Sequence, residues 1–294
     1  MNARALSVSA TASDFLSLTK PRLSSLVLVT TAGGMWLSPS GLSPVRQIAS
    51  LLAVAGLVGG ANALNCFLER DVDRLMARTR NRPLPAGRMD PQVALWFGIL
   101  LAAVSLPTLF FEANPITALL GCIAFFTYVF VYTPLKSRSY AAMLVGAVPG
   151  ALPPLMGWTA ANGTIGGPGL VLFAILFLWQ LPHFIAISLY RQGEYAAAGL
   201  KSLPVQRGEE ASRLQLLGYT VALVPVTLLP SLLGIAGLLY GLLALGLGAI
   251  ALGMAIHGTV AKLGKAWARR VFRFSLIHLA ILFAGLWIDV GLRR

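Results

Sequence analysis

Long stretches without a charged residue constrain this chain more than any other feature of its sequence. Six such stretches cover 23–45, 47–68, 91–111, 113–135, 139–190 and 214–261. A helix that crosses the hydrocarbon core of a bilayer needs about 20 apolar residues. Each of the first four stretches therefore suits one crossing. The last two are long enough for two crossings each, and we expect breaks in the Gly-rich segment 159–169 and near Gly234.

A further apolar segment, 271–290, brings the expected number of membrane spans to about nine. Lipid offers no hydrogen-bond partner to a backbone amide, so these spans should be helices. The stretches also lack the polar alternation of a transmembrane β-barrel. We predict an all-α integral membrane protein, with a disordered N-terminus at 1–15 and a single transmembrane domain at 16–294.

The positive charges lie almost entirely on one side of this expected topology. The chain has a net charge of +13. If the N-terminus starts in the cytoplasm, every Lys and Arg except Arg46, Arg293 and Arg294 falls in a cytoplasmic segment. This is the positive-inside pattern of multi-pass proteins. It predicts an N-in/C-out protein of a bacterial inner membrane, and it accounts for the basic charge without nucleic-acid binding.

One cytoplasmic segment, NCFLERDVDRLMARTRNRPLPAGR at 65–88, is unusually rich in charge. Asn65, Glu69 and Asp73 are spaced so that they share one helix face, whereas Asp71 points elsewhere. Carboxylate and amide oxygens are hard ligands suited to Mg²⁺, and the negative end of the helix dipole lies at this point. Like charges on one face repel each other, which favours a bound cation.

Several arginines follow these acidic residues directly. Guanidinium groups match the geometry of phosphate oxygens, so the segment predicts a site for a metal-bound di- or triphosphate at the membrane surface. The alternative is a loop whose positive charges contact anionic lipid headgroups. The arginines in question are Arg78, Arg80, Arg82 and Arg88.

A second polar segment, WQLPHFIAISLYRQGEYAAAGLKSLPVQRG at 179–208, also ends on the cytoplasmic side. Helical spacing places His183, Arg191 and Glu194 on one face. His183 and Glu194 lie about 16 Å apart along a helix, so His183 belongs inside the membrane. It is either a ligand-binding residue or an interior histidine that bonds the carbonyl freed by Pro182.

The short loop YTPLKSRS at 132–139 is basic as well. Lys136 and Arg138 are placed either to reach a phosphate from the opposite wall or to anchor the topology.

Together these segments resemble the UbiA superfamily of intramembrane prenyltransferases. The similar motifs are LTKPR, the acidic segment 65–88, YTPLKSRS, GAVPGALPPLMGW, and WQLPHF followed by EYAAAGLKSLPV. LPHF with YxxAG is similar to the protohaem IX farnesyltransferase (haem O synthase) branch, whereas quinone-type relatives have more aspartates there. The resemblance implies a UbiA-like fold with nine transmembrane helices around a central cavity, and an active site on the cytoplasmic side.

The resemblance also implies a reaction and its participants. A farnesyl group would pass from farnesyl diphosphate to a vinyl group of haem b, with Mg²⁺ as cofactor, in contact with membrane lipids. A haem A synthase or an oxidase assembly protein is a possible partner. The other functions that fit are prenylation of a quinone precursor, and transport or lipid binding.

The resemblance gives roles to particular residues. Asn65, Glu69 and Asp73 are implied to hold one Mg²⁺ and Glu194 a second, and these four are the implied catalytic residues. His183 is implied to position the haem. The candidates for the diphosphate are Lys136, Arg138, Arg82 and Arg191, with Lys20 and Arg22 as further ones.

Two positions depart from the family pattern. Glu69 stands where an aspartate is usual, which keeps the carboxylate on a longer arm. Gly193 stands before Glu194 where the family often has a second carboxylate, which weakens the case for a second metal held by protein groups alone.

Overall fold

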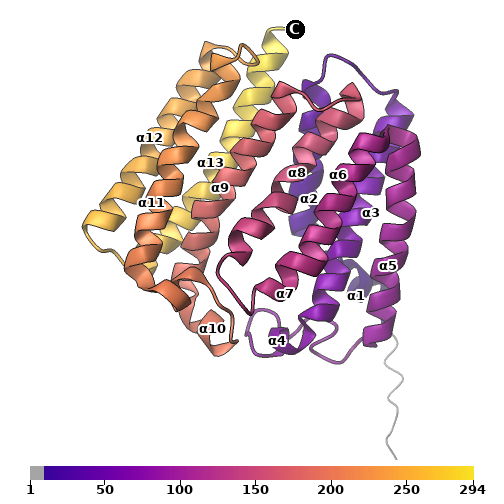
Figure 1. Cartoon of the computed structure of the whole chain (residues 1–294), viewed down its shortest axis with the longest axis vertical. Coiled ribbons are helices and arrows are strands. Elements are labelled where there is room, and N and C mark those ends of the chain that lie inside the picture. Colours follow the sequence, from indigo (N-terminus) through magenta and orange to yellow (C-terminus); the bar gives the residue numbers. More distant parts are fainter. Residues whose placement is uncertain (1–9) are drawn as a thin grey trace, which may run out of the picture.

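The protein is a bundle of long helices that run along one axis (Figure 1). A computed structural model describes residues 10–294, so most of the N-terminus predicted to be disordered lies outside it. The first helix begins at Ala12. No strand occurs in the described part of the chain, and the all-α prediction is confirmed.

The helices follow one another in a simple order. They are α1 (Ala12–Leu18), α2 (Pro21–Leu37), α3 (Pro44–Leu68), α4 (Arg70–Arg74), α5 (Pro91–Thr108), the π-helix η1 (Leu109–Ala113), α6 (Pro115–Phe126), the π-helix η2 (Thr127–Tyr132), α7 (Thr133–Leu135), α8 (Ala142–Asn162), α9 (Gly167–Tyr190), α10 (Gln192–Ala197), α11 (Leu203–Leu232), α12 (Leu238–Val260) and α13 (Lys265–Leu292). Proline opens α2, α3, α5 and α6, where its missing N–H costs no helical hydrogen bond.

Within residues 10–294, seven segments are long and apolar enough to cross a membrane. They are α3, α5 with η1, α6 through α7, α9, α11, α12 and α13. α2, with 17 residues, and α8, with three internal prolines, lie outside this set but extend alongside it in the bundle (Figure 1).

Both predicted breaks are confirmed. The first falls between α8 and α9, where Gly163 takes φ +78 as the C-cap of α8. The second falls between α11 and α12, where Gly234 has φ +72. Positive φ values are costly for residues with a Cβ and available to glycine, so the chain reverses direction at the two glycine-containing segments.

Glycines bring α2 and α8 into backbone contact. A Cβ built on Gly157 would overlap the carbonyl oxygen of Thr31, and one built on Gly34 would overlap the carbonyl oxygen of Pro154. Small residues at such crossings let helices in a membrane approach closely and pack by van der Waals contact. The close α2–α8 contact therefore depends on having no side chain at either glycine.

Replacing Gly157 with alanine is expected to push α8 away from α2. Overpacking of this kind costs about 1–3 kcal/mol, so thermal unfolding in detergent should occur at a lower temperature. Gly246→Ala in α12 is the matched control, because a Cβ there meets open space. Equal unfolding temperatures for the two variants would contradict the close α2–α8 contact.

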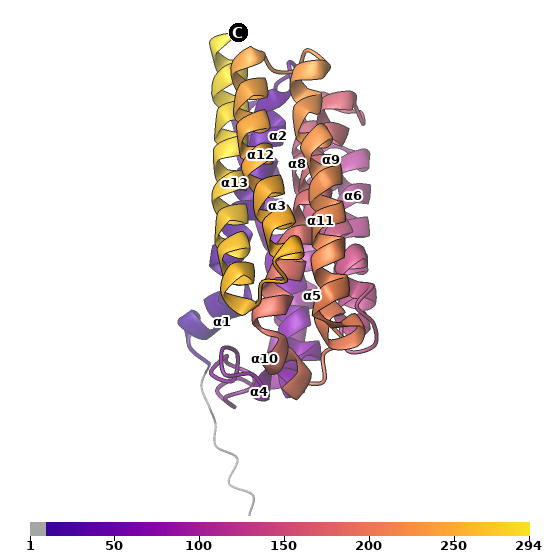
Figure 2. The ribbon, with the colours of Figure 1, turned by 90° about the vertical axis from the view of Figure 1, so that its left-hand side faces the viewer.

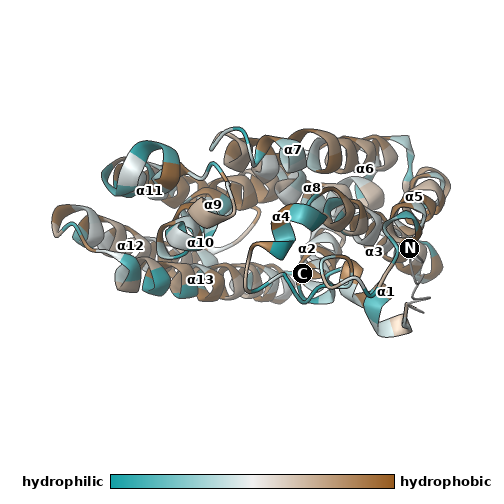
Figure 3. Ribbon diagram, turned by 90° about the horizontal axis from the view of Figure 1, so that it is seen from below, coloured by the Kyte–Doolittle hydropathy of each residue, from teal (hydrophilic) through white to brown (hydrophobic). Residues whose placement is uncertain are grey.

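The polar elements gather at one end of the bundle. α1, α4 and α10 lie at that end, and the C-terminus lies at the opposite one (Figures 1 and 2). Seen from the polar end, α4 stands out as hydrophilic against the mostly apolar long helices (Figure 3).

Candidate active site

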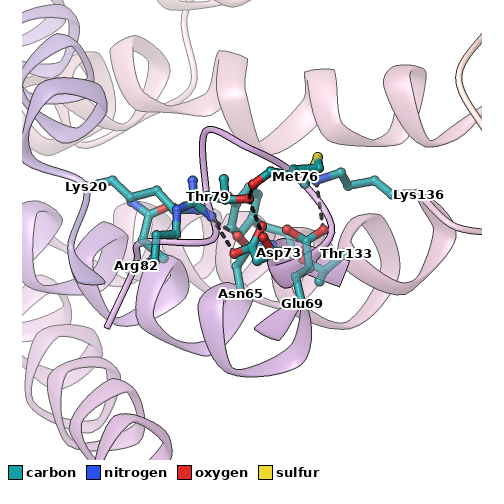
Figure 4. Close-up of polar contacts among 11 residues, drawn as sticks. Lys20, Asn65, Glu69, Asp73, Met76, Thr79, Arg82, Thr133 and Lys136 are labelled. Atoms are coloured by element: carbon teal, nitrogen blue, oxygen red, sulfur yellow. Dashed lines mark hydrogen bonds and ion pairs between the residues drawn. The ribbon is translucent and has the colours of Figure 1, made fainter. Parts of the chain in front are cut away.

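The acidic segment bends where the sequence predicted a continuous helix. α3 ends at Leu68 and α4 begins at Arg70, with Glu69 between them at φ −95 and ψ 6. The helical hydrogen bonds nevertheless continue, from Glu69 N to Asn65 O at 2.9 Å and from Asp73 N to Glu69 O at 2.8 Å. The three predicted ligands therefore stay together (Figure 4).

Asn65 is held in a defined orientation. Its Nδ2 donates to Thr133 Oγ1 at 3.0 Å, and its Oδ1 accepts from Lys20 Nζ at 2.6 Å. Lys20 precedes α2 with φ +50, a left-handed conformation that is uncommon for a residue other than glycine. Burial lowers the pKa of Lys20. Arg22, by contrast, is exposed. Of the two cations in the LTKPR motif, the structure therefore brings Lys20 into the cluster.

Glu69 pairs with Lys136 across the site. Its Oε1 lies 2.7 Å from Lys136 Nζ, and the Glu69 side chain is 12% exposed. Burial pushes the pKa of Glu69 upward, but the charge and hydrogen bond of Lys136 outweigh it and hold this pKa below its usual value. The carboxylate is therefore ionised at neutral pH. Lys136 Nζ also lies 5.4 Å from the centre of the Tyr132 ring.

Asp73 is the most deeply buried of the three. Its side chain is 1% exposed, and Oδ2 accepts from Arg82 Nη1 at 2.7 Å. Thr79 Oγ1 donates to the Asp73 carbonyl at 2.8 Å, which folds the following loop back over α4. Asp71 points away, as predicted: its side chain is 71% exposed and contacts Arg74 at 3.4 Å.

Of the other predicted residues, Arg191, Glu194 and Arg138 make no side-chain hydrogen bond or ion pair with this cluster in the described chain. Arg191 Nη1 contacts both carboxylate oxygens of Glu194, at 3.0 and 2.8 Å, and the Glu194 side chain is 40% exposed. Arg138 is exposed. Over residues 10–294, no three His, Cys, Asp or Glu side chains come close enough to hold a metal ion by themselves. α10 still borders the site, because Tyr195 packs against Met76 of the loop after α4.

An apolar cavity of about 340 Å³ lies inside the bundle, between α2, α3, α6, α8 and α9. Asn62, one turn before Asn65, lines it together with Tyr128 and Tyr132 of η2. Tyr128 Oη donates to Asn62 Oδ1 at 3.3 Å. His183 of α9 lines the same cavity, so the predicted interior histidine shares this space with Asn62, which lies one turn from the cluster residue Asn65.

The donor set at this cluster fits a metal-bound diphosphate. Two carboxylates and one neutral amide each contact a cationic side chain (Figure 4). The three positive charges therefore face two negative ones. Mg²⁺ prefers one or two carboxylates and shares its remaining positions with water and phosphate oxygens. If it bound here, the three cations would be free to contact the diphosphate.

Comparison with known proteins places the chain in a family. The model of the UbiA prenyltransferase family matches residues 27–277. A protoheme IX farnesyltransferase of Myxococcus xanthus is 61% identical over 289 residues, which cover 98% of this chain and 98% of the relative. A protoheme IX farnesyltransferase of Anaeromyxobacter sp. is 51% identical over 277 residues, covering 94% and 93%.

Solved structures share the fold at low sequence identity. A digeranylgeranylglyceryl phosphate synthase superposes with a TM-score of 0.82 at 18% identity, over 95% of this chain and 98% of the other. A UbiA homologue from Archaeoglobus fulgidus bound to DMAPP and Mg²⁺ gives 0.67 at 18% identity, over 95% and 99%. These structures show the fold, and the family model and the full-length relatives establish that the chain is a prenyltransferase and belongs to the UbiA prenyltransferase family.

Proposed function

We propose that this protein transfers a farnesyl group from farnesyl diphosphate to a vinyl group of protohaem IX (haem b), giving haem O, with Mg²⁺ as cofactor. The observation that carries the proposal is the 61% identity to a protoheme IX farnesyltransferase over nearly the whole of both chains. It favours haem over a quinone precursor as the acceptor. The charged cluster lies at one end of the bundle, whereas transporter substrate sites lie near the middle of the membrane, which disfavours a transporter.

The proposed placement in the membrane uses nine crossings. α2 and α8 join the seven apolar segments, and the N-terminus faces the cytoplasm of a bacterium. α1, α4 and α10 lie at one end and the C-terminus at the other (Figure 2), which supports N-in/C-out with the site at the cytoplasmic face of the inner membrane.

The acidic cluster would hold the metal. Asn65, Glu69 and Asp73 supply its oxygen ligands, and bound Mg²⁺ would neutralise charge on the departing diphosphate. Arg191 and Glu194, which now pair with each other, are proposed to separate: Arg191 binds the diphosphate and Glu194 reaches a second metal through water.

The basic side chains would change partners when substrate binds. Lys20, Arg82 and Lys136 now contact the oxygens of the acidic cluster. Bound Mg²⁺ would occupy the carboxylate oxygens, and the cations would then turn to the phosphate oxygens, which also accept charge-assisted hydrogen bonds. Arg138 and Arg22, both exposed, would contact its outer oxygens.

The α2 and α3 side of the cavity would hold the isoprenoid chain and exclude water, which leaves the α9 side for the acceptor. The cavity walls are mostly apolar, so the allylic cation left after diphosphate departs is shielded from early quenching. The haem vinyl group attacks this cation, water then adds to the resulting carbocation, and a proton is released. Farnesyl diphosphate, haem b and water thus give haem O, diphosphate and a proton.

A product assay tests the proposed function. Purified protein in lipid nanodiscs, with haem b, farnesyl diphosphate and Mg²⁺, should yield a haem heavier by one farnesyl group and one water, detected by mass spectrometry. A hydroxybenzoate acceptor in place of haem should give no product. Prenylation of that acceptor alone would identify a quinone-type enzyme, and no diphosphate release at all would point to a transporter.

Removal of divalent metal is expected to stop the transfer. With excess EDTA the rate should fall at least about a hundredfold, because charge on the departing diphosphate is no longer neutralised, and added Mg²⁺ should restore it. The measurement is product formed per minute before chelation, after it, and after Mg²⁺ is returned. Transfer that continues unchanged in EDTA would rule out the assigned metal role.

A further inference from the structure

Two aromatic rings from different helices pack against the imidazole ring of His183. Trp179, one turn earlier on α9, stacks on it with ring centres 4.7 Å apart and planes 23° apart. Phe272 of α13 lies on it at 4.8 Å and 36°. The ring makes polar contacts at its edges, and these are the directions in which imidazole nitrogens bind protons or metals.

Hydrogen-bond accounting fixes which ring nitrogen carries the proton. His183 Nδ1 lies 2.7 Å from Ser275 Oγ. Ser275 Oγ has one proton, and it donates that proton to the Phe272 carbonyl at 2.7 Å. Its contact with His183 must therefore be an acceptor contact. Nδ1 carries the proton, and Nε2 keeps a free lone pair.

A third hydrogen bond locks this arrangement. Trp179 Nε1 donates to the Ser275 carbonyl at 2.8 Å, so the residue that stacks on His183 also holds the serine that bonds it. α9 and α13 thus fix the ring in position and in tautomer.

The free nitrogen opens into the cavity. His183 lines it, and no side chain or backbone group in the described chain hydrogen-bonds Nε2. Within residues 10–294, Nε2 of His278 is buried without a hydrogen-bond partner, whereas Nε2 of His183, which also lacks such a partner, is not buried. The His183 edge therefore has open surface, and the cavity is the space it faces.

Two amide side chains of the cavity wall are already engaged in hydrogen bonds. The Gln180 amide donates to the carbonyls of Ala147 and Leu176, and Asn62 donates to the Thr19 carbonyl. An unengaged imidazole lone pair in an apolar space, with its other nitrogen donating to an oxygen, is the arrangement typical of metal-binding histidines.

We propose that His183 Nε2 is an axial ligand to the iron of the haem acceptor, and that Ser275 is its positioning residue. The inference rests on the proposed function, because it names the contact by which the same site recognises haem. Coordination would anchor the porphyrin at the α9 wall while its edge extends toward the polar cluster, where the farnesyl cation forms.

Two porphyrins separate iron binding from packing. Haem b and metal-free protoporphyrin IX carry the same vinyl groups, so each is titrated into nanodisc-embedded protein without farnesyl diphosphate. The wild type should bind haem at least about tenfold more tightly than protoporphyrin IX. His183→Ala should lose this preference and leave protoporphyrin affinity within about twofold. His278→Ala is the matched control and should keep the preference.

Spectroscopy tests the bond itself and the role of Ser275. The ferrous haem complex of the wild type should show an iron–histidine stretching band by resonance Raman, and His183→Ala should lose it. Ser275→Ala should keep the band at lower frequency, because a hydrogen bond to Nδ1–H raises the basicity of the ligand. A merely structural serine would leave the frequency unchanged.

The outcomes distinguish this inference from the proposed function. If the wild type forms no farnesylated haem, the proposed function fails. If it forms that product but binds both porphyrins equally, or if His183→Ala keeps the band, iron coordination by His183 is overturned. A His183→Ala protein that loses transfer but keeps the haem preference would also overturn it, because haem binding would then not depend on this residue.

Discussion

Asp73→Asn is expected to lower farnesyl transfer at least about a hundredfold, the scale of losing one charge-stabilising group from an active site. Asp73 is almost completely buried and binds Arg82 at 2.7 Å. Asparagine keeps its volume and one oxygen but removes the negative charge, so a divalent ion loses a ligand and Arg82 loses its counter-ion. The initial rate of haem O formation at saturating Mg²⁺ measures the loss.

The same helix, α4, supplies a control of identical chemistry. Asp71 is 71% exposed and contacts only arginines at the surface, and such pairs contribute little to stability. Asp71→Asn should therefore keep transfer within about twofold. Both variants should elute as monodisperse protein with unchanged helical content. Full activity of Asp73→Asn, or equal losses in the two variants, would remove Asp73 from the metal site.

Lys136→Met is expected to cause the second large effect, again about a hundredfold in transfer. Methionine keeps an unbranched apolar stem but not the ammonium group, so the diphosphate loses one of its cations. Glu69, 12% exposed, is left as a nearly buried carboxylate without a partner, and this should lower the unfolding temperature in the absence of metal. Added Mg²⁺ should raise the unfolding temperature more in the variant than in the wild type, because the ion no longer competes with Lys136 for the Glu69 carboxylate.

Lys201→Met provides the comparison for this test. Lys201 contacts Lys136 only through its backbone N–H, which donates to the Lys136 carbonyl at 3.1 Å, and its side chain is exposed. Transfer and Mg²⁺ stabilisation should both match the wild type. If Mg²⁺ stabilises Lys136→Met no more than it stabilises Lys201→Met, the ammonium and the metal do not compete for Glu69.

The resting cluster suggests how the site avoids an energetic penalty before substrate binds. Buried carboxylates without partners are costly, and here Lys20, Lys136 and Arg82 contact the acidic cluster. We infer that Arg82 and Lys136 serve twice, first as counter-ions of Asp73 and Glu69 and then as ligands of the diphosphate. Both expected results above follow from this double role.

The sequence alone was enough to predict the helical elements and the acidic face. Charge-free length determines where a membrane helix fits, and glycine permits the turns at Gly163 and Gly234. The spacing of Asn65, Glu69 and Asp73 was enough to place them together and Asp71 apart, because helical periodicity is a local property. Even the bend at Glu69 preserves it, since the i to i−4 hydrogen bonds continue through the bend.

The tertiary structure decided which distant groups complete the site. Lys20 reaches Asn65 across 45 positions of the chain, and Ser275 reaches His183 across 92; nothing in the local pattern distinguishes Lys20 from Arg22, or Ser275 from any other serine in a helix. These pairings depend on how closely helices approach, which is set by contacts such as Gly157 against Thr31. Periodicity fixes the direction of a side chain on its own helix, whereas its partner is fixed only when the helices pack.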